Sequence, residues 1–181
     1  SIKGILGEQM RVADAIFARI KKETSVVYFV PGGGCMYLTD ALGRSGIPYV
    51  AHLHEQGAGF AAIGHAMYTN KLAVCLVTSG PGSANVLTAV AASWMDSVPV
   101  LFVSGQAKSS TLVGETGLRT RGVQEIDIIR MVKPITKKAY QPMTSGHDCL
   151  MALDDMILEC MFQRRGPCFL SIPLDIQNAE V

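Results

Sequence analysis

The chain has 181 residues, of which 49% are hydrophobic and 17% charged, and its formal net charge is +1. This length suits one sizeable core and is short for two ordinary domains. Lysines and arginines cluster no further than local pairs, which argues against nucleic acid as a partner. Since the sequence holds no long apolar run, we also expect no membrane association.

Short apolar runs alternate with helix-like stretches along the chain. The runs predict strands at residues 26–30, 49–53, 72–77, 100–103, 136–140 and 168–172. The stretches predict helices at residues 8–22, 37–45, 56–68, 84–95, 125–131 and 148–164. Because the strand runs are continuously apolar, we expect them to be buried on both faces. The pattern predicts a single doubly wound α/β domain, with a parallel sheet of about six strands and helices on both faces.

The cysteines are five in number and show no C-x-x-C spacing. Cys75 and Cys168 fall inside apolar runs, where a reduced cysteine acts as a small hydrophobe. This usage predicts a reducing, cytoplasmic compartment rather than a disulfide framework.

Several turn-like segments follow predicted strands, at residues 31–34, 54–57, 78–85 and 104–106. Ligands of open α/β sheets bind at the carboxyl ends of the strands. Any one of these segments could be no more than a turn, but together they predict a shared crevice. The longest predicted loop, and the one we expect to be most mobile, covers residues 108–124.

The segment at residues 78–85 is a tight turn that opens a predicted helix. Gly80 and Gly82 remove side chains where a ligand could approach the backbone, and Pro81 stiffens the bend. We expect Ser83 to cap the helix that follows. No Gly-Lys-Ser/Thr follows the turn, so it is not a phosphate-binding P-loop and is better suited to a ring.

Glu55 opens another predicted helix, and it has two interpretations. A structural acid at a helix N-terminus is stabilised by the helix dipole and is often solvated. The small residues at positions 57–59, 61 and 62, however, would leave an apolar recess beside the carboxylate. A carboxyl sheltered in such a recess has a raised pKa and can donate a proton near neutral pH.

Two other patterns carry less weight. Residues 57–62 match the dinucleotide fingerprint G-x-G-x-x-A, but these glycines lie inside the predicted helix rather than at its start, and no acid ends the next strand. We treat this match as chance. His52, His54 and His65 fit no strong metal-ligand spacing, so we predict no metal site in this chain.

Taken together, the motifs resemble the N-terminal pyrimidine-binding domain of thiamine-diphosphate-dependent enzymes, and acetolactate synthases most closely. The resemblance covers nearly the whole chain. Its motifs are Phe-Val-Pro-Gly-Gly at 29–33, His-Glu-Gln-Gly at 54–57, Thr-Ser-Gly-Pro-Gly-Ser-Ala-Asn at 78–85, Gln-Glu at 124–125 and Arg-Gly-Pro at 165–167.

The resemblance implies a 2-oxo-acid carboligase or decarboxylase that uses thiamine diphosphate. Glu55 would be catalytic and would activate the cofactor by hydrogen bonding to its aminopyrimidine ring. The implied cofactor-binding residues are Pro31, Gly32, Glu55, Thr78, Gly80, Gly82 and Asn85. Gly33 and Gln124 would face the substrate. In such enzymes the cofactor carries the carbanion chemistry, and the protein orients and tunes it.

This sequence lacks the motif with which the family binds the diphosphate group of the cofactor. The family holds the diphosphate and Mg²⁺ through a Gly-Asp-Gly…Asn-Asn motif on a second domain, and this chain contains no Gly-Asp pair. The resemblance therefore implies a diphosphate-binding domain, on the same or a partner chain, within a homodimer or tetramer. The chain alone would be inactive. It is either one domain excised from a longer multi-domain chain, which we favour, or a separate subunit.

Departures from the family's pattern bear on the substrate. Val30 stands where acetolactate synthases usually have tyrosine, and Val123 where they have phenylalanine. Smaller side chains would open the acceptor pocket, which puts pyruvate self-condensation in doubt. One alternative is a carboligase acting on a larger acceptor, such as a nucleotide sugar or a lipopolysaccharide precursor. Another is a non-catalytic assembly module of the same fold.

Overall fold

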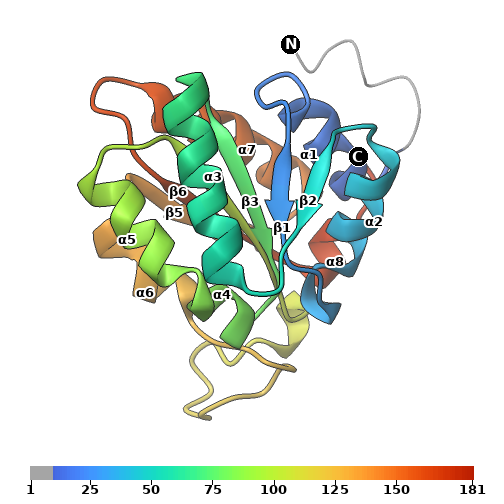
Figure 1. Cartoon of the computed structure of the whole chain (residues 1–181). Coiled ribbons are helices and arrows are strands. Elements are labelled where there is room, and N and C mark those ends of the chain that lie inside the picture. Colours follow the sequence, from blue (N-terminus) through green and yellow to red (C-terminus); the bar gives the residue numbers. More distant parts are fainter. Residues whose placement is uncertain (1–9) are drawn as a thin grey trace.

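A computed structural model describes residues 10–181 (Figure 1). The strands are β1 (Val27–Phe29), β2 (Tyr49–Ala51), β3 (Ala73–Val77), β4 (Val100–Gln106), β5 (Lys138–Tyr140) and β6 (Cys168–Pro173). The α-helices are α1 (Val12–Ile20), α2 (Met36–Arg44), α3 (Glu55–Thr69), α4 (Pro81–Asn85), α5 (Leu87–Met95), α6 (Ile128–Val132), α7 (Gly146–Met161) and α8 (Leu174–Gln177). Three short 3₁₀ helices are η2 (Gly33–Cys35), η3 (Ser109–Thr111) and η4 (Lys133–Ile135).

All six strands belong to one parallel sheet, in the order β2-β1-β3-β4-β6-β5. Helices α1, α2, α7 and α8 cover one face, and α3, α5 and α6 cover the other (Figure 1). The predicted single doubly wound α/β domain is confirmed. The order reverses at β1, because the chain moves outward to β2 and then returns to place β3 on the other side of β1.

Each face of the sheet has its own hydrophobic core. Phe17, Leu38 and Leu153 are among the fully buried side chains of one core. The other contains Phe102 and Phe169, whose stacked rings have centroids 6.3 Å apart. Burial of this apolar surface is the main force that holds the helices on the sheet.

The central strands β3, β4 and β6 are buried along their whole length, as their continuous apolar runs predict. The same prediction is wrong for β2, whose three residues are all exposed. The physical reason is position: β2 is an edge strand with β1 as its sole neighbour in the sheet. Its apolar side chains therefore remain open to an external contact.

Helix boundaries differ from the sequence prediction in several places. The predicted helix at 84–95 is two helices, because Pro81 starts α4 at a position that suits proline, and the chain is interrupted at Val86 before α5. Helix α8 had no counterpart among the predicted helices. Helix α1 begins at Val12; the predicted start at residue 8 lies outside the described residues.

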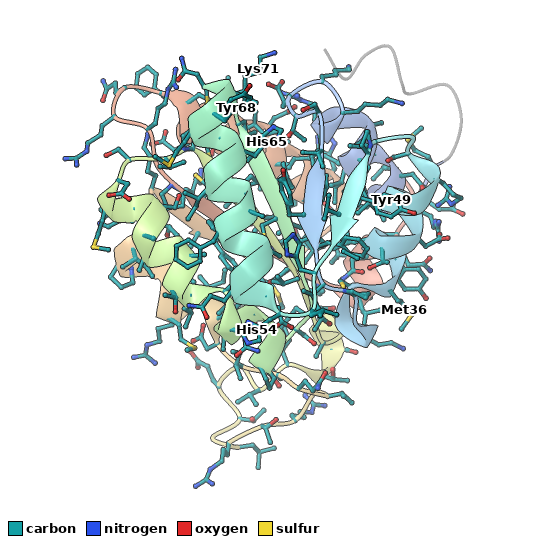
Figure 2. The ribbon with its side chains drawn as sticks, in the orientation of Figure 1. Met36, Tyr49, His54, His65, Tyr68 and Lys71 are labelled. Carbon is teal, nitrogen blue, oxygen red and sulfur yellow. The ribbon has the colours of Figure 1, made fainter. Side chains whose placement is uncertain are left out.

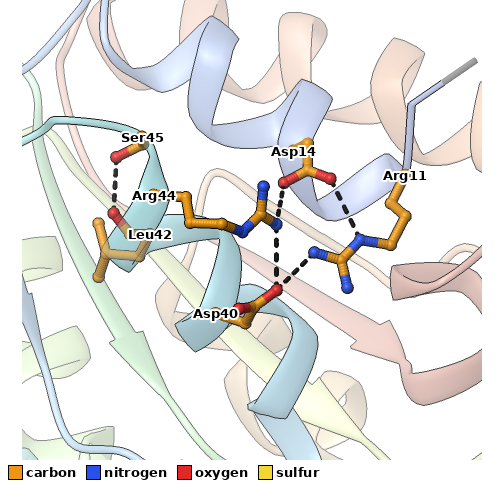
Figure 3. A network of polar contacts seen from close by, with 6 residues as sticks. All are labelled: Arg11, Asp14, Asp40, Leu42, Arg44 and Ser45. Carbon is orange, nitrogen blue, oxygen red and sulfur yellow. Dashed lines mark hydrogen bonds and ion pairs between the residues drawn. The ribbon is translucent and has the colours of Figure 1, made fainter.

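An ion-pair network on the surface joins α1 to α2 (Figure 3). Arg44 contacts Asp14 at 2.5 Å and Asp40 at 3.0 Å, and Arg11 bonds to both carboxylates as well. The Arg11 and Arg44 guanidinium groups lower the pKa of Asp40 through hydrogen bonds. Exposed pairs of this kind contribute little to stability, so the network mainly fixes how the two helices meet.

All five cysteines are buried and free. Burial raises the pKa of the Cys75 thiol, which keeps it protonated and apolar in β3. Within residues 10–181, no helix combines the length and the apolar character needed to cross a membrane.

Candidate active site at the carboxyl ends of the strands

The loops that follow β1, β3 and β4 meet at one end of the sheet, the lower end in Figure 1. This end lies beside the point where the strand order reverses, which is where open α/β sheets bind ligands. The N-terminus of α3, helix α4 and the loop after β4 all lie there (Figure 1).

Glu55 is the first residue of α3, and its carboxylate is held at the helix N-terminus. His54 caps the helix: its Nδ1 accepts a hydrogen bond of 3.1 Å from the backbone N–H of Gln56. Figure 2 labels His54 at this end of α3, with His65 and Tyr68 near the other end.

Asn85, at the end of α4, orients the Glu55 side chain. Its Nδ2 donates a hydrogen bond of 3.0 Å to Oε2 of Glu55. The other carboxylate oxygen, Oε1, faces the backbone of Gly82: a Cβ atom placed on Gly82 would lie 3.3 Å from it. Within residues 10–181, Oε1 accepts no hydrogen bond. One oxygen is thus fixed and the other is available to a ligand.

The burial of Glu55 is less complete than the sequence suggests. The residue is half-buried in this chain, even though Ala58 and Gly59 behind it are fully covered. Gly59 lets α3 approach α5 closely, since a Cβ there would lie 2.5 Å from Cβ of Ala89. Gly59 therefore serves helix packing and does not add to the shelter of the carboxylate.

Thr78 joins the loop after β1 to the turn after β3. Its Oγ1 accepts a hydrogen bond of 3.0 Å from the backbone N–H of Gly34. Its side chain also fills the positions that Cβ atoms on Gly32 and Gly82 would take, at 2.5 Å from each. The missing side chains of these two glycines therefore make room for Thr78. At Gly82 we expected them to make room for a ligand, but on the Cβ side that space is filled by Thr78.

Gly80 and Gln124 connect the turn to the loop after β4. Gly80 has φ of 59°, in the left-handed region, and a Cβ there would lie 2.1 Å from the carbonyl oxygen of Gln124. Gln124 is itself left-handed, with φ of 54°. The expected cap by Ser83 is wrong: α4 starts at Pro81, and the Ser83 hydroxyl instead donates to the Gly80 carbonyl at 2.8 Å.

A cavity of about 380 Å³ lies beside this turn. It is lined by Gly33 and Gln124, the two predicted substrate residues, together with Ser79 and Val123. Lys108 and Arg121, from the loop at residues 108–124, also line it. This volume is at the small end of the usual range for small-molecule sites.

The structure thus brings together most of the residues that the sequence singled out. Glu55, Asn85, Gly82, Thr78 and Gly32 form one continuous set of contacts, and Gly80, Gln124 and Gly33 connect it to the cavity. Pro31, which precedes Gly32 in the same loop, is exposed.

Several residues at this site were not singled out by sequence reasoning. Glu125 closes the long loop, because its carboxylate accepts from the backbone N–H groups of Val113 at 2.5 Å and Gly122 at 3.0 Å. Asp175 of α8 accepts from the backbone N–H of Ser109 at 2.9 Å. Gln177 donates 2.8 Å hydrogen bonds to the carbonyls of Gly34 and Ile172. The contacts of Asp175 with Ser109 and of Gln177 with Gly34 join segments far apart in the sequence, so a local motif gives no signal for them.

His65 and His52 both contact Tyr28. His65 of α3 lies 3.3 Å from the Tyr28 hydroxyl, and burial lowers the pKa of its ring. His52 packs its ring against Tyr28 from the other side. Across residues 10–181, no group of three or more His, Cys, Asp or Glu side chains could hold a metal ion.

Comparison with known proteins agrees with this geometry. The family model for the thiamine pyrophosphate enzyme, N-terminal TPP binding domain, matches residues 10–131. This range contains Glu55, the turn at 78–85 and Gln124.

Individual relatives are acetolactate synthases. The chain is 37% identical to the acetolactate synthase large subunit of Corynebacterium glutamicum over 96% of its length. It is 36% identical to the acetolactate synthase isozyme 2 large subunit of Escherichia coli over 86% of its length. The match covers 27% of each of these proteins, so the chain spans about a quarter of its relatives' length. The chain belongs to the thiamine pyrophosphate enzymes, as an N-terminal cofactor-binding domain of the acetolactate synthase type.

Proposed function

We propose that the chain is the pyrimidine-binding half of a thiamine-diphosphate-dependent 2-oxo-acid carboligase or decarboxylase, a transferase or lyase. The observation that carries the proposal is the Glu55 carboxylate. Asn85 fixes its Oε2, while Oε1 stays without a partner in residues 10–181, beside the Gly80-Pro81-Gly82 bend. A carboxyl oxygen without a hydrogen-bond partner could bond to the ring nitrogen of an aminopyrimidine, which needs a proton donor.

The residues of this chain would hold and move one proton. Glu55 would share a proton with the ring nitrogen through Oε1, and Asn85 would keep the carboxyl group in line. When bound, thiamine diphosphate supplies the carbanion chemistry that breaks and forms the carbon–carbon bonds. Pro31, Gly32, Thr78 and Gly80 would shape the ring side of the site. Gly33 and Gln124, which line the 380 Å³ cavity, would face the substrate.

Completion of the site requires a second domain, because this chain offers no motif for the diphosphate group and Mg²⁺. We propose that this domain belongs to the remainder of a longer polypeptide or to a partner chain, that the complete enzyme is a homodimer or tetramer, and that the isolated chain is inactive. The relatives, of which this chain spans about a quarter, support this. A cytoplasmic setting fits the free, buried cysteines.

The outer face of α3 is the surface we propose for that contact. Phe60, Met67 and Tyr68 are exposed on it at spacings that place them on one side of the helix, and Tyr68 is 92% exposed. Leu53, just before the helix, is fully exposed as well. Apolar side chains gathered in this way mark protein interfaces. A domain seated here would also reach Glu55, at the start of the same helix.

Tyr68→Glu tests this face. In the complete protein we expect the change to lower the assembly state, because it places a charge in an apolar interface, and sedimentation velocity measures the result. Met151→Glu, at an exposed methionine of α7 on the opposite face of the sheet, is the control. An assembly state unaffected by Tyr68→Glu argues that α3 is not the contact surface.

The acceptor is proposed to be larger than pyruvate. Val123 is 83% exposed and lines the cavity, so the space that a phenylalanine would fill is open there. Val30 does not add to this opening, since it packs against the core on the α3 side of the sheet. A nucleotide sugar or a lipopolysaccharide precursor is an acceptor of suitable size.

The experiment that tests the catalytic role is exchange of the cofactor's C2 proton for deuterium in the complete enzyme. The wild type is compared with Glu55→Gln, which keeps the shape of the side chain and removes its acid. Glu115→Gln, at an exposed position of the long loop, is the control for loss of a carboxyl group.

A further inference from the structure

The cavity beside Gln124 has an unusual balance of charge. Lys108 and Arg121 line it, and no acidic side chain does. The neighbouring cavity, in contrast, is lined by Arg119 together with Glu125 and Asp127, so its charges can compensate one another. The substrate-side cavity is therefore a local site of positive charge in a chain with a net charge of only +1.

Neither cation is engaged with the rest of the described chain. Within residues 10–181, the side chains of Lys108 and Arg121 form no ion pair and no hydrogen bond. Three other arginines differ in this respect, since Arg11, Arg19 and Arg44 each bond to two carboxylates. The two cavity cations keep all their donors for a ligand.

The backbone beside each cation is nonetheless anchored. Asp175 bonds to the backbone N–H and the hydroxyl of Ser109, next to Lys108. Glu125 bonds to the N–H of Gly122, next to Arg121. Both carboxylates bond to main-chain or hydroxyl donors next to the cations. They fix where the cations stand without lining the cavity.

We propose that Lys108 and Arg121 bind the phosphate or diphosphate group of a phosphate-bearing acceptor substrate; this inference rests on the proposed function. Arginine donates paired hydrogen bonds that match phosphate oxygens, and lysine adds a compact point charge. The rest of the lining is mostly uncharged, with Met36, Val123 and Leu174 able to contact the ligand's less polar part.

The same cations could instead meet the carboxylate of the 2-oxo-acid donor. A diphosphate is favoured because it offers a charge to each cation, whereas a 2-oxo acid has a single carboxylate. The cavity also has room for more than a small oxo acid, since the position beside Gln124 holds only a valine.

The test is calorimetric titration of the complete enzyme, saturated with thiamine diphosphate and Mg²⁺, with UDP as the probe. Uridine, which lacks the diphosphate, is titrated in parallel, and the KM of pyruvate is measured by steady-state kinetics because the loaded enzyme would consume it. The variants are Lys108→Met and Arg121→Met, both at exposed positions where loss of charge leaves the core intact. Lys108→Arg keeps the charge, and Lys133→Met removes an exposed lysine of η4 that does not line the cavity.

We expect UDP to bind at least about tenfold more tightly than uridine, and each Met variant to weaken UDP about tenfold, the usual scale for a charge-assisted hydrogen bond. Lys108→Arg should restore most of the affinity, and Lys133→Met should change nothing. Equal affinity for UDP in wild type and both Met variants overturns the phosphate site. If the two Met variants change only the KM of pyruvate, the phosphate site is also overturned, because the cations then bind the carboxylate of the donor.

The proton-exchange experiment separates this inference from the proposed function. If proton exchange depends on Glu55 but UDP affinity is the same with and without the two cations, the phosphate site alone is overturned. Exchange that does not depend on Glu55 overturns the proposed function, and with it the assignment of these cations to an acceptor.

Discussion

At the scale of single residues, the candidate site depends on where side chains are absent as much as on where they are present. Asn85 holds Glu55, and Thr78 fits between two loops because Gly32 and Gly82 carry no Cβ atoms. The Thr78 hydroxyl is already bonded to Gly34, so its side chain cannot rotate away without losing that bond. The position of the carboxylate is therefore coupled to the position of the turn.

Gly82→Ala tests this coupling. The added methyl group would lie 2.5 Å from Cγ2 of Thr78 and 3.3 Å from Oε1 of Glu55, so one of them must move. Overpacking of this kind costs about 1–3 kcal/mol. We expect the complete enzyme to bind thiamine diphosphate about tenfold more weakly, which corresponds to ~1.4 kcal/mol, and calorimetry measures it. Unchanged affinity would show that the turn can relax away from the carboxylate.

At the scale of elements, α3 connects the core to the site. Its inner side packs on β3 and α5 through small residues, its first residue is Glu55, and its outer side is apolar and exposed. A helix that must approach its neighbours closely cannot carry larger inner side chains. This is why residues 57–62 match a dinucleotide fingerprint by chance: Gly59 faces Val86 and Ala89 of the neighbouring helical segment, not a ligand.

Two helix glycines should respond to alanine in opposite ways. Gly43 of α2 is exposed and a Cβ there meets nothing, so Gly43→Ala should stabilise the protein by about 0.5–1 kcal/mol through helix propensity. Gly59→Ala should destabilise it by about 1–3 kcal/mol, because the new Cβ would clash with Ala89 and Val86. Urea unfolding of both variants measures the difference. The same sign for both would contradict the packing described for α3.

At the scale of the whole molecule, much of the fold could be predicted from the sequence. Continuous apolar runs identified the buried strands β3, β4 and β6, because a run of that kind has no solvent-facing side. The same rule failed for β2, since periodicity cannot tell a strand buried in the sheet from an apolar edge strand. Strand-end turns located the site, because parallel strands all end at one edge of the sheet.

The remainder depends on contacts between distant segments. That Asp175 bonds to Ser109, or that Gln177 bonds to Gly34, follows from packing that no local motif records. The same holds for the convergence of Lys108 and Arg121 on one cavity. The sequence predicted a loop there, but not which of its side chains would share a surface.

The central claim is that the Glu55 carboxyl group gives the aminopyrimidine its proton. Deuterium exchange at C2 of the bound cofactor, followed by proton NMR of quenched samples of the complete enzyme, tests this most directly. The predicted result for Glu55→Gln is exchange slower by about 10²–10⁴-fold, equivalent to ~3–5 kcal/mol, with Glu115→Gln matching the wild type. An exchange rate for Glu55→Gln equal to that of the wild type, with the cofactor still bound, would contradict it.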